Sequence, residues 1–207
     1  RGFSACWPVA IVEVPHHPEH PHDIPAAMNS ELKRIIKRMD DEDLYVAFTE
    51  VLRRRSDPET NGPANATIVT SASSREGKTH VAVSLAVQAV AIHQQRTLVV
   101  DAAVQKRGCA SRYLRQDHRK SVGTSGTADE RCMPTEFPLL DVLTWGPRVV
   151  LPGATKEEAQ KSLADVLGKL RPKYDLIVID AGSMCDGPGM FGLLRCADRI
   201  LFVVEHR

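Results

Sequence analysis

Short apolar runs alternate with longer amphipathic stretches along most of the chain. The apolar runs have the length and β-branched composition of buried strands, and they lie at Thr67–Thr70, Thr97–Asp101, Leu139–Thr144, Tyr174–Asp180 and Arg199–Val204. Helical patterns separate them, from Lys78 to about Gln94, from Thr155 to near Leu170 and near Met190–Arg195. Apolar strands that alternate with helices are typical of a parallel sheet covered on both faces. We therefore predict an α/β fold with a mostly parallel, doubly wound sheet and helices on both faces.

The N-terminal part lacks this pattern. Residues 1–40 show no sustained periodicity, and the segment Pro15–Asp23 holds four histidines among its prolines. Because open Pro-rich tracts hold no fixed ligand geometry, a solvated linker is favoured here over a metal site. Ala10–Val14 is either a short strand or a docking element, and an amphipathic helix is predicted over residues 40–55. We predict an irregular Pro/His-rich tail or linker over residues 1–40 and one folded domain over residues 41–207.

Composition and charge exclude several classes of protein. Hydrophobic residues make up 43% of the chain and charged residues 26%, which are ordinary globular values. The net charge of +1 gives no indication of a nucleic-acid partner. Five scattered cysteines indicate reduced thiols in a cytoplasmic protein, and no apolar run approaches the length of about 18 residues that a membrane span needs. Because the chain begins with Arg1 and ends directly after a predicted strand, we expect a fragment of a longer protein.

The segment Thr70–Thr79 has the layout of a phosphate-binding P-loop. It follows the apolar run Ala66–Val69, ends in Gly-Lys-Thr and leads directly into a helical pattern. Backbone amides of such a loop and the positive end of the next helix converge on one anion. We therefore predict that Lys78 reaches the terminal phosphates, that the Thr79 hydroxyl ligates magnesium, and that the nucleotide is bound by Ser74, Arg75, Glu76, Gly77, Lys78, Thr79 and His80. Ala72 stands where the motif usually has its first glycine.

Two acids end later strands of the predicted sheet. Asp180 ends the apolar run that begins at Tyr174, as in a Walker B motif, and Asp101 ends another such run. A carboxylate beside a P-loop can hold magnesium or its water shell, and a second one can hold the metal or orient a nucleophile. Either acid alone could instead cap a loop. Together they predict Lys78, Asp101 and Asp180 as catalytic residues, and Thr79, Asp101 and Asp180 as metal ligands.

These motifs resemble those of bacterial tyrosine kinases, the cytoplasmic domains that regulate the chain length of capsular and exopolysaccharides. The resemblance covers roughly residues 40–206, and its Walker A, A′ and B motifs lie at Thr70–Thr79, Leu98–Ala102 and Tyr174–Asp180. The family belongs to the P-loop ATPases that include the chromosome-partitioning and septum-site proteins. The resemblance implies binding of ATP and Mg²⁺, phosphorylation of protein tyrosines, often on a neighbouring subunit of a ring-like oligomer, and a membrane partner in polysaccharide export.

The chain departs from the family pattern at several positions. In the A′ motif, Ala103 and Gln105 replace the usual second acid and arginine, although Lys106 and Arg107 follow closely. Ser74 and Arg75 replace the usual Pro-Gly of the loop, and Ala181-Gly182-Ser183 replaces the usual Thr-Pro-Pro after the Walker B acid. Loss of a carboxylate on the metal side removes transition-state stabilisation but leaves binding largely intact.

Three functions remain open on the sequence. The first is an ATP-dependent tyrosine kinase acting in exopolysaccharide synthesis or export. The second is a catalytically impaired scaffold that docks on a polysaccharide-export membrane partner, which the missing acid and arginine favour. The third is a partitioning-type ATPase. Such ATPases usually carry an extra lysine near the start of the loop, and its absence here, where Ala72 and Ser73 stand, counts against this function. We expect a cytoplasmic protein, or one peripheral to the inner face of the cell membrane through its partner, that could form homo-oligomers.

Overall fold

The computed structural model describes residues 9–13, 48–49, 51–52, 64–102, 110–114, 132–145, 156–186 and 193–204. Within them, seven strands form one sheet in the order β1-β7-β2-β6-β3-β5-β4. All neighbouring strands are parallel except the edge pair of β4 and β5, which is antiparallel. The predicted α/β class with a mostly parallel sheet is confirmed.

The four central strands are those that the apolar runs predicted, with small changes at their ends. Their bounds are β2 (Asn65–Ser71), β6 (Leu176–Asp180), β3 (Thr97–Asp101) and β5 (Leu140–Thr144). β7 (Arg199–Val204) has the predicted bounds. Nearly all residues of β2, and every residue of β3 and β6, are buried, because helices cover both faces of the sheet. Their continuous apolar runs reflect this burial on two sides.

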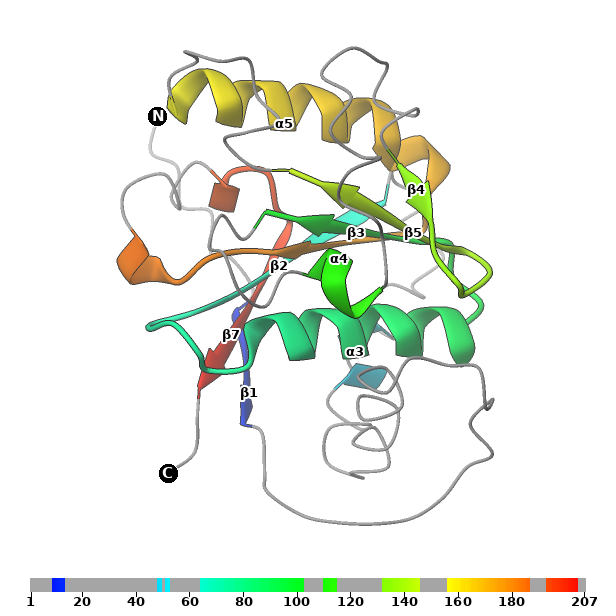
Figure 1. The fold of residues 1–207 in the computed structure, drawn as a ribbon, viewed down its shortest axis with the longest axis horizontal. Helices are drawn as coiled ribbons and strands as arrows, with labels where there is room; N and C mark the ends of the chain where they lie inside the picture. The colour runs from blue at the N-terminus through cyan, green and yellow to red at the C-terminus, as the bar shows by residue number, and fades with distance from the viewer. Residues whose placement is uncertain are drawn as a thin grey trace, which may run out of the picture.

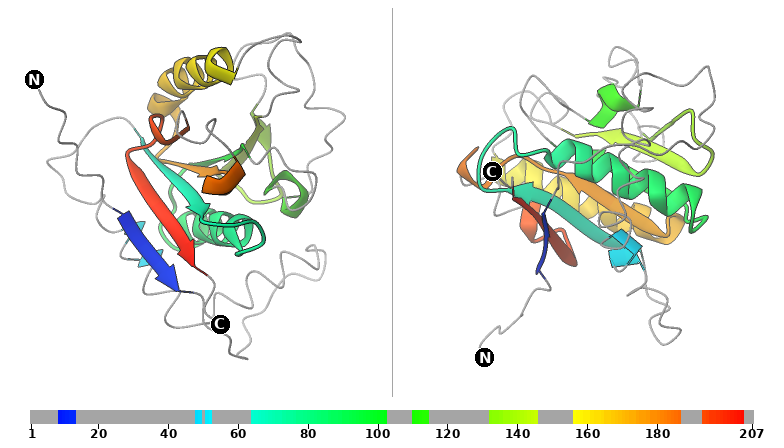
Figure 2. Two further views of the ribbon diagram at one scale, coloured as in Figure 1. Left: turned by 90° about the vertical axis from the view of Figure 1, so that its left-hand side faces the viewer. Right: turned by 90° about the horizontal axis from the view of Figure 1, so that it is seen from below.

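The first strand, β1 (Val9–Glu13), forms one edge of the sheet. It pairs in parallel with β7 over five residues, from Val9 beside Ile200 to Glu13 beside Val204. In Figure 2 the two strands lie side by side at the margin of the sheet. The sheet thus takes a strand from the segment that the sequence assigned to a tail or linker, and the domain boundary near residue 40 stays a prediction.

Helices α3, α4 and α5 accompany the strands in the described part of the chain. α3 (Lys78–Ala91) ends a turn earlier than predicted, and α5 (Lys156–Leu170) ends at the expected residue and continues into the 3₁₀ turn η2 (Arg171–Lys173). The short helix α4 (Ala110–Tyr113) and strand β4 (Met133–Pro134) lie where the sequence pattern was too weak to predict an element. A 3₁₀ turn, η3 (Met184–Asp186), follows β6.

Some predicted features lie partly or wholly outside the described residues. The helix expected near Met190–Arg195 is seen as a helical turn at residues 193–194, and the helix expected over residues 40–55 is seen at residues 48–49 and 51–52. The histidine-rich Pro15–Asp23 and Thr155, where the second helical pattern was predicted to begin, lie outside.

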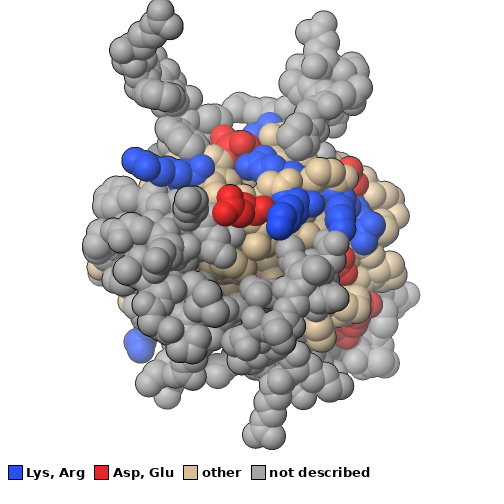
Figure 3. Space-filling view, turned by 90° about the horizontal axis from the view of Figure 1, so that it is seen from above, with Lys and Arg blue, Asp and Glu red and all other residues tan. Residues whose placement is uncertain are grey.

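The elements form three layers with the sheet in the middle. α5 covers one face, and α3 with α4 covers the other (Figure 1). Each face has its own apolar core: one contains Leu163, Leu167 and Leu170 of α5, and the other contains the buried residues of α3. Seen from the α5 side, Lys and Arg side chains lie interspersed with Asp and Glu (Figure 3). This described surface therefore has no extended region of one charge.

α3 is buried all round and not along one stripe. Its residues from Val81 to Val90 are all buried, including the polar Gln88. Phe48 and Leu52, from the helical segment before β2, belong to the same core, and the Gln88 side-chain amide donates to the Thr49 hydroxyl at 3.1 Å. α3 is thus enclosed between the sheet and this segment.

Among the described helices, none is both long and apolar enough to cross a lipid bilayer.

Candidate functional site

The loop between β2 and α3 has the backbone shape that its glycine pattern predicts. Gly77 is the residue directly before α3 and has a left-handed conformation, with φ of 88°. Arg75 is also left-handed, with φ of 71°, although its Cβ makes that conformation unfavourable. The family pattern has glycine at this position, and the structure shows the reason: the chain turns here in a way that glycine adopts without strain.

The Lys78 side chain folds back over the start of the loop. Its ammonium donates to the Ser71 hydroxyl at 2.9 Å and to the Ser73 carbonyl at 2.9 Å. The Ser71 hydroxyl in turn donates to the same carbonyl at 2.6 Å. The predicted phosphate-binding lysine is therefore held at the mouth of the loop by two oxygens from the loop itself.

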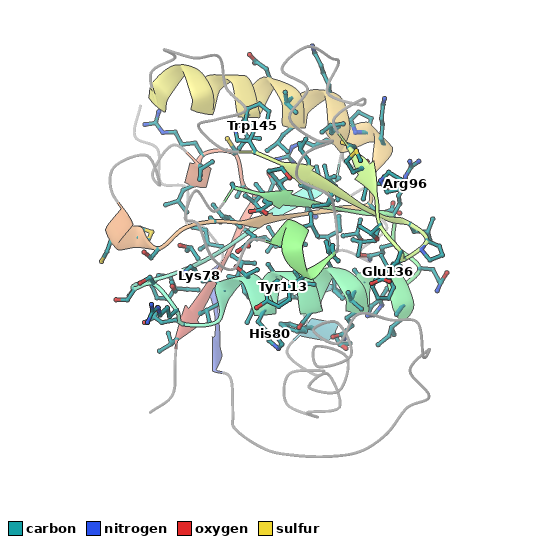
Figure 4. The ribbon with its side chains drawn as sticks, viewed as in Figure 1. Lys78, His80, Arg96, Tyr113, Glu136 and Trp145 are labelled. Atoms are coloured by element: carbon teal, nitrogen blue, oxygen red, sulfur yellow. The ribbon has the colours of Figure 1, made fainter. Side chains whose placement is uncertain are left out.

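Glu76 forms a further hydrogen bond within the same loop. Its carboxylate accepts a hydrogen bond from the Ser73 amide at 2.9 Å. Ser74 and Arg75 lie between the two bonded residues and are exposed, as is Gly77. His80 lies in the first turn of α3, and Figure 4 shows its side chain on the side of the helix away from the sheet. If His80 contacts a nucleotide, as the sequence predicts, the contact would come from its backbone.

The two predicted acids are direct neighbours across the sheet. β6 lies between β2 and β3, and Asp180 stands opposite Asp101 on one side and Val69 on the other. The Ala102 amide donates to the Asp180 carbonyl at 2.9 Å, which fixes this register at the carboxyl ends of the strands. Ligands of open α/β sheets bind at this end. The fold therefore brings Asp101 and Asp180 together, beside the strand that leads into the P-loop.

Asp180 is fully buried, and Asp101 is nearly so. Neither carboxylate oxygen of Asp180 accepts a hydrogen bond of ordinary geometry from the described residues. The pKa of Asp180 is raised to about 8, chiefly by burial and also by the negative charge of Asp101, although the Thr79 hydroxyl, the Lys78 ammonium and the Ala110 amide act to lower it. Such a carboxylate needs either a proton or a cation at this place.

This donor set fits a magnesium ion. Two adjacent carboxylates and the Thr79 hydroxyl are hard oxygen ligands, and the orphaned oxygens of Asp180 are the groups that a cation would satisfy. No group of three or more His, Cys, Asp or Glu side chains with metal-binding geometry occurs among the described residues. Magnesium would therefore complete its shell with phosphate oxygens and water, as it commonly does.

Two hydroxyl residues at the end of β2 were not singled out from the sequence. Ser71 is buried and contacts Lys78, and Thr70 donates to the Gly182 carbonyl at 2.8 Å. The second contact ties the loop after Asp180 to the loop before Lys78. The signal that would have revealed Ser71 is a polar residue at the last position of an otherwise apolar strand, directly before a phosphate-binding loop. The A′ positions Ala103, Gln105, Lys106 and Arg107 lie outside the described residues.

Comparisons with known proteins give the fold a context. No family profile and no curated protein sequence matches the chain. Among solved structures, the kinase domain of the Escherichia coli tyrosine kinase ETK aligns over 79% of this chain and 62% of its own length, with 19% identity and a TM-score of 0.62. The VpsO kinase domain aligns over 81% of each chain, with 19% identity and a TM-score of 0.59.

A third structure belongs to the wider ATPase group. The septum site-determining protein MinD of Pyrococcus horikoshii, solved with Mg-ADP, aligns over 68% of this chain and 58% of its own length, with 19% identity and a TM-score of 0.51. The chain thus spans less than two thirds of the length of the ETK domain and of MinD. The fold is that of bacterial tyrosine kinase domains and MinD-type P-loop ATPases, as the sequence resemblance implied.

Proposed function

We propose that this chain binds MgATP in the Thr70–Thr79 loop and transfers its γ-phosphoryl group to a protein tyrosine. The observation that carries the proposal is the pair Asp101 and Asp180, buried side by side at the strand ends next to a loop that holds Lys78. A buried acid pair without a cation is unfavourable, and a nucleotide-bound magnesium ion is the partner that a P-loop brings.

Each residue has a distinct role in this proposal. The loop amides and Lys78 would hold the β- and γ-phosphates and offset their charge. Thr79 and Asp180 would hold magnesium, which neutralises phosphate charge when bound. Asp101 would orient the tyrosine hydroxyl and accept its proton as the oxygen attacks phosphorus and ADP leaves. The tyrosine is then phosphorylated and the proton passes to solvent.

The biological setting is proposed from the resemblance. The neighbours include tyrosine kinase domains, and we propose a role in controlling exopolysaccharide length or export, at the inner face of the membrane, through a membrane partner and a homo-oligomer. An impaired scaffold is the second candidate, and the replacement of the A′ acid by Ala103 favours it. A partitioning-type ATPase is less well supported, because Ser73 stands in the part of the loop where such proteins carry a second lysine.

Titration of ATP by calorimetry, with and without Mg²⁺, tests the binding site. Lys78→Ala should weaken binding at least about tenfold, because an ammonium contact to phosphate is lost. Lys169→Ala is the matched control, because Lys169 is an exposed lysine near the end of α5. Equal affinity for ATP in the wild type and Lys78→Ala would show that the loop is no phosphate site.

An anti-phosphotyrosine blot after incubation with MgATP separates the kinase from the scaffold. A kinase should give a signal that disappears in Asp180→Ala and persists in Asp165→Ala, which removes an exposed acid of α5. ATP binding without any phosphotyrosine signal would favour the scaffold.

A further inference from the structure

Ser71 has an unusual position for a hydroxyl group. It is the last residue of β2, with 0% of its surface exposed, and its oxygen lies 2.9 Å from the Lys78 ammonium. It is close in space to Lys78 because the loop between them returns on itself. The predicted phosphate-binding residues begin only at Ser74, so nothing assigned so far explains the contact.

The direction of each hydrogen bond follows from chemistry. An ammonium group only donates, so the Ser71 oxygen must accept from Lys78. A serine hydroxyl has one proton, and at 2.6 Å from the Ser73 carbonyl that proton is directed to the carbonyl oxygen. The Ser73 carbonyl then accepts hydrogen bonds from both Ser71 and Lys78, and the Ser73 amide donates one to Glu76. Three groups therefore form a closed triangle that defines where the ammonium lies.

We propose that Ser71 is a positioning residue for Lys78. It holds the ammonium at the mouth of the loop, so that the charge is already in place when a phosphate group arrives. This inference rests on the proposed nucleotide site. Its physical basis is preorganisation: a long lysine side chain otherwise loses rotamer freedom on binding, and a buried acceptor removes that cost beforehand.

The burial of Ser71 strengthens its hydrogen bond with Lys78. A hydrogen bond from a charged donor to a buried acceptor is stronger than one at the surface, and Ser71→Ala removes that acceptor from the ammonium. We expect Ser71→Ala to weaken the binding of ATP and of ADP by about tenfold, with the fold kept. Ser71→Cys should behave like Ser71→Ala, because a thiol is nearly the size of the hydroxyl but a weak acceptor.

The test is calorimetric titration of ATP and ADP into the wild type, Ser71→Ala, Ser71→Cys and the control Ser84→Ala. Ser84 is a buried serine of α3 outside the triangle, so its loss should leave affinity unchanged within about twofold. If Ser71 matters only for packing, Ser71→Cys will bind like the wild type, and the proposal is then wrong. Circular dichroism confirms that each variant is folded.

A double-mutant cycle with Lys78→Ala decides whether Ser71 acts through the lysine. If it does, adding Ser71→Ala to Lys78→Ala costs no further affinity, whereas additive losses would overturn the proposal. Where binding of Lys78→Ala is too weak to measure, the same cycle in the free energy of unfolding gives the coupling between the two side chains. Failure of the wild type to bind any nucleotide would instead refute the proposed function, so the two failures are distinguishable.

Discussion

The two ends of the strands in the central sheet satisfy their polar groups in opposite ways. At the amino ends, charged side chains form hydrogen bonds with backbone groups far away in the sequence. At the carboxyl ends, the Lys78 side chain bonds to residues of the adjoining loop, and two acids lie buried together. Figure 4 shows the separation, with Lys78 and Arg96 at opposite ends of the strands. The comparison distinguishes the part of the molecule that stabilises the fold from the part that is available for binding.

At the amino ends, two networks connect distant segments. The Arg171 guanidinium donates to the Ala64 carbonyl at 2.7 Å, to the Asp198 carboxylate at 2.6 Å and to the Cys196 carbonyl at 3.1 Å. Asp198 also accepts from the Ala66 amide at 2.7 Å. In the second network, Tyr174 donates to Asp141 at 2.8 Å, and Arg96 lies over the tyrosine ring at 5.3 Å.

At the carboxyl ends, the same fold carries unfavourable features close together. Asp180 is buried without a hydrogen bond of ordinary geometry from the described residues, Asp101 lies beside it, and Arg75 has a left-handed backbone. Such features persist only where the surrounding structure holds them in place, and they are typical of binding sites. The amino-end networks contribute to the stability that holds them.

The largest effect that we expect from a single substitution on stability is at the amino end. Arg171→Ala should lower the free energy of unfolding by about 2 to 3 kcal/mol, because it leaves Asp198 and two carbonyl groups without their partner. The figure is at the low end for a broken ion pair because the pair is partly exposed. Urea unfolding measures it.

The binding site should be unaffected by that change. Nucleotide affinity of the folded Arg171→Ala protein is expected to match the wild type, and Lys173→Ala serves as the control for removal of a nearby exposed cation. If Arg171→Ala lost nucleotide binding while it remained stable, the separation between the two ends would be wrong.

The second effect is a pH dependence that belongs to the carboxyl end. The pKa of Asp180 is about 8 in the folded chain against an ordinary value of 3.8, so the folded state binds the extra proton between these values. Stability without nucleotide should therefore fall as pH rises from about 5 to about 8, by at most about 1.4 kcal/mol per pH unit. Asp180→Asn should flatten this slope in thermal unfolding scans, and an unchanged slope would contradict the assignment.

The sequence was sufficient for the parts of the fold that local patterns determine. The apolar runs predicted the central strands because burial on both faces demands continuous apolar residues, as at Leu176–Asp180. It did not predict that β6 lies between β2 and β3, since strand order depends on long-range packing. β4 was missed because two residues carry no periodic signal, and β1 was left open because five residues fit either reading.

The same division applies to the candidate site. Lys78, Asp101 and Asp180 could be named because their positions after apolar runs place them at one edge of a parallel sheet. The role of Ser71 was not visible, because it depends on how the loop folds back. The network of Arg171 and Asp198 had no sequence signal either, since ordinary charges so far apart in the chain give no pattern.

A smaller effect at the amino end measures what one hydrogen bond contributes to stability. Tyr174→Phe should lower the free energy of unfolding by about 1 kcal/mol, because it removes the bond to Asp141 but keeps the buried ring. Burial raises the pKa of Tyr174, so the hydroxyl stays protonated and donates at every pH at which the fold is stable. Thermal unfolding measures the loss, and a variant as stable as the wild type would show that the bond contributes nothing net.

The smallest effect concerns the strained backbone of the loop. Arg75→Gly should raise the free energy of unfolding by up to about 1 kcal/mol, because glycine adopts the φ of 71° without the Cβ clash and loses part of that gain to its greater freedom when unfolded. Arg75→Ala is the matched control: it removes the guanidinium but keeps the Cβ. A glycine variant more stable than the alanine variant assigns the effect to the backbone, whereas equal stability would mean that Arg75 stores no strain and that only the buried acids set the carboxyl end apart.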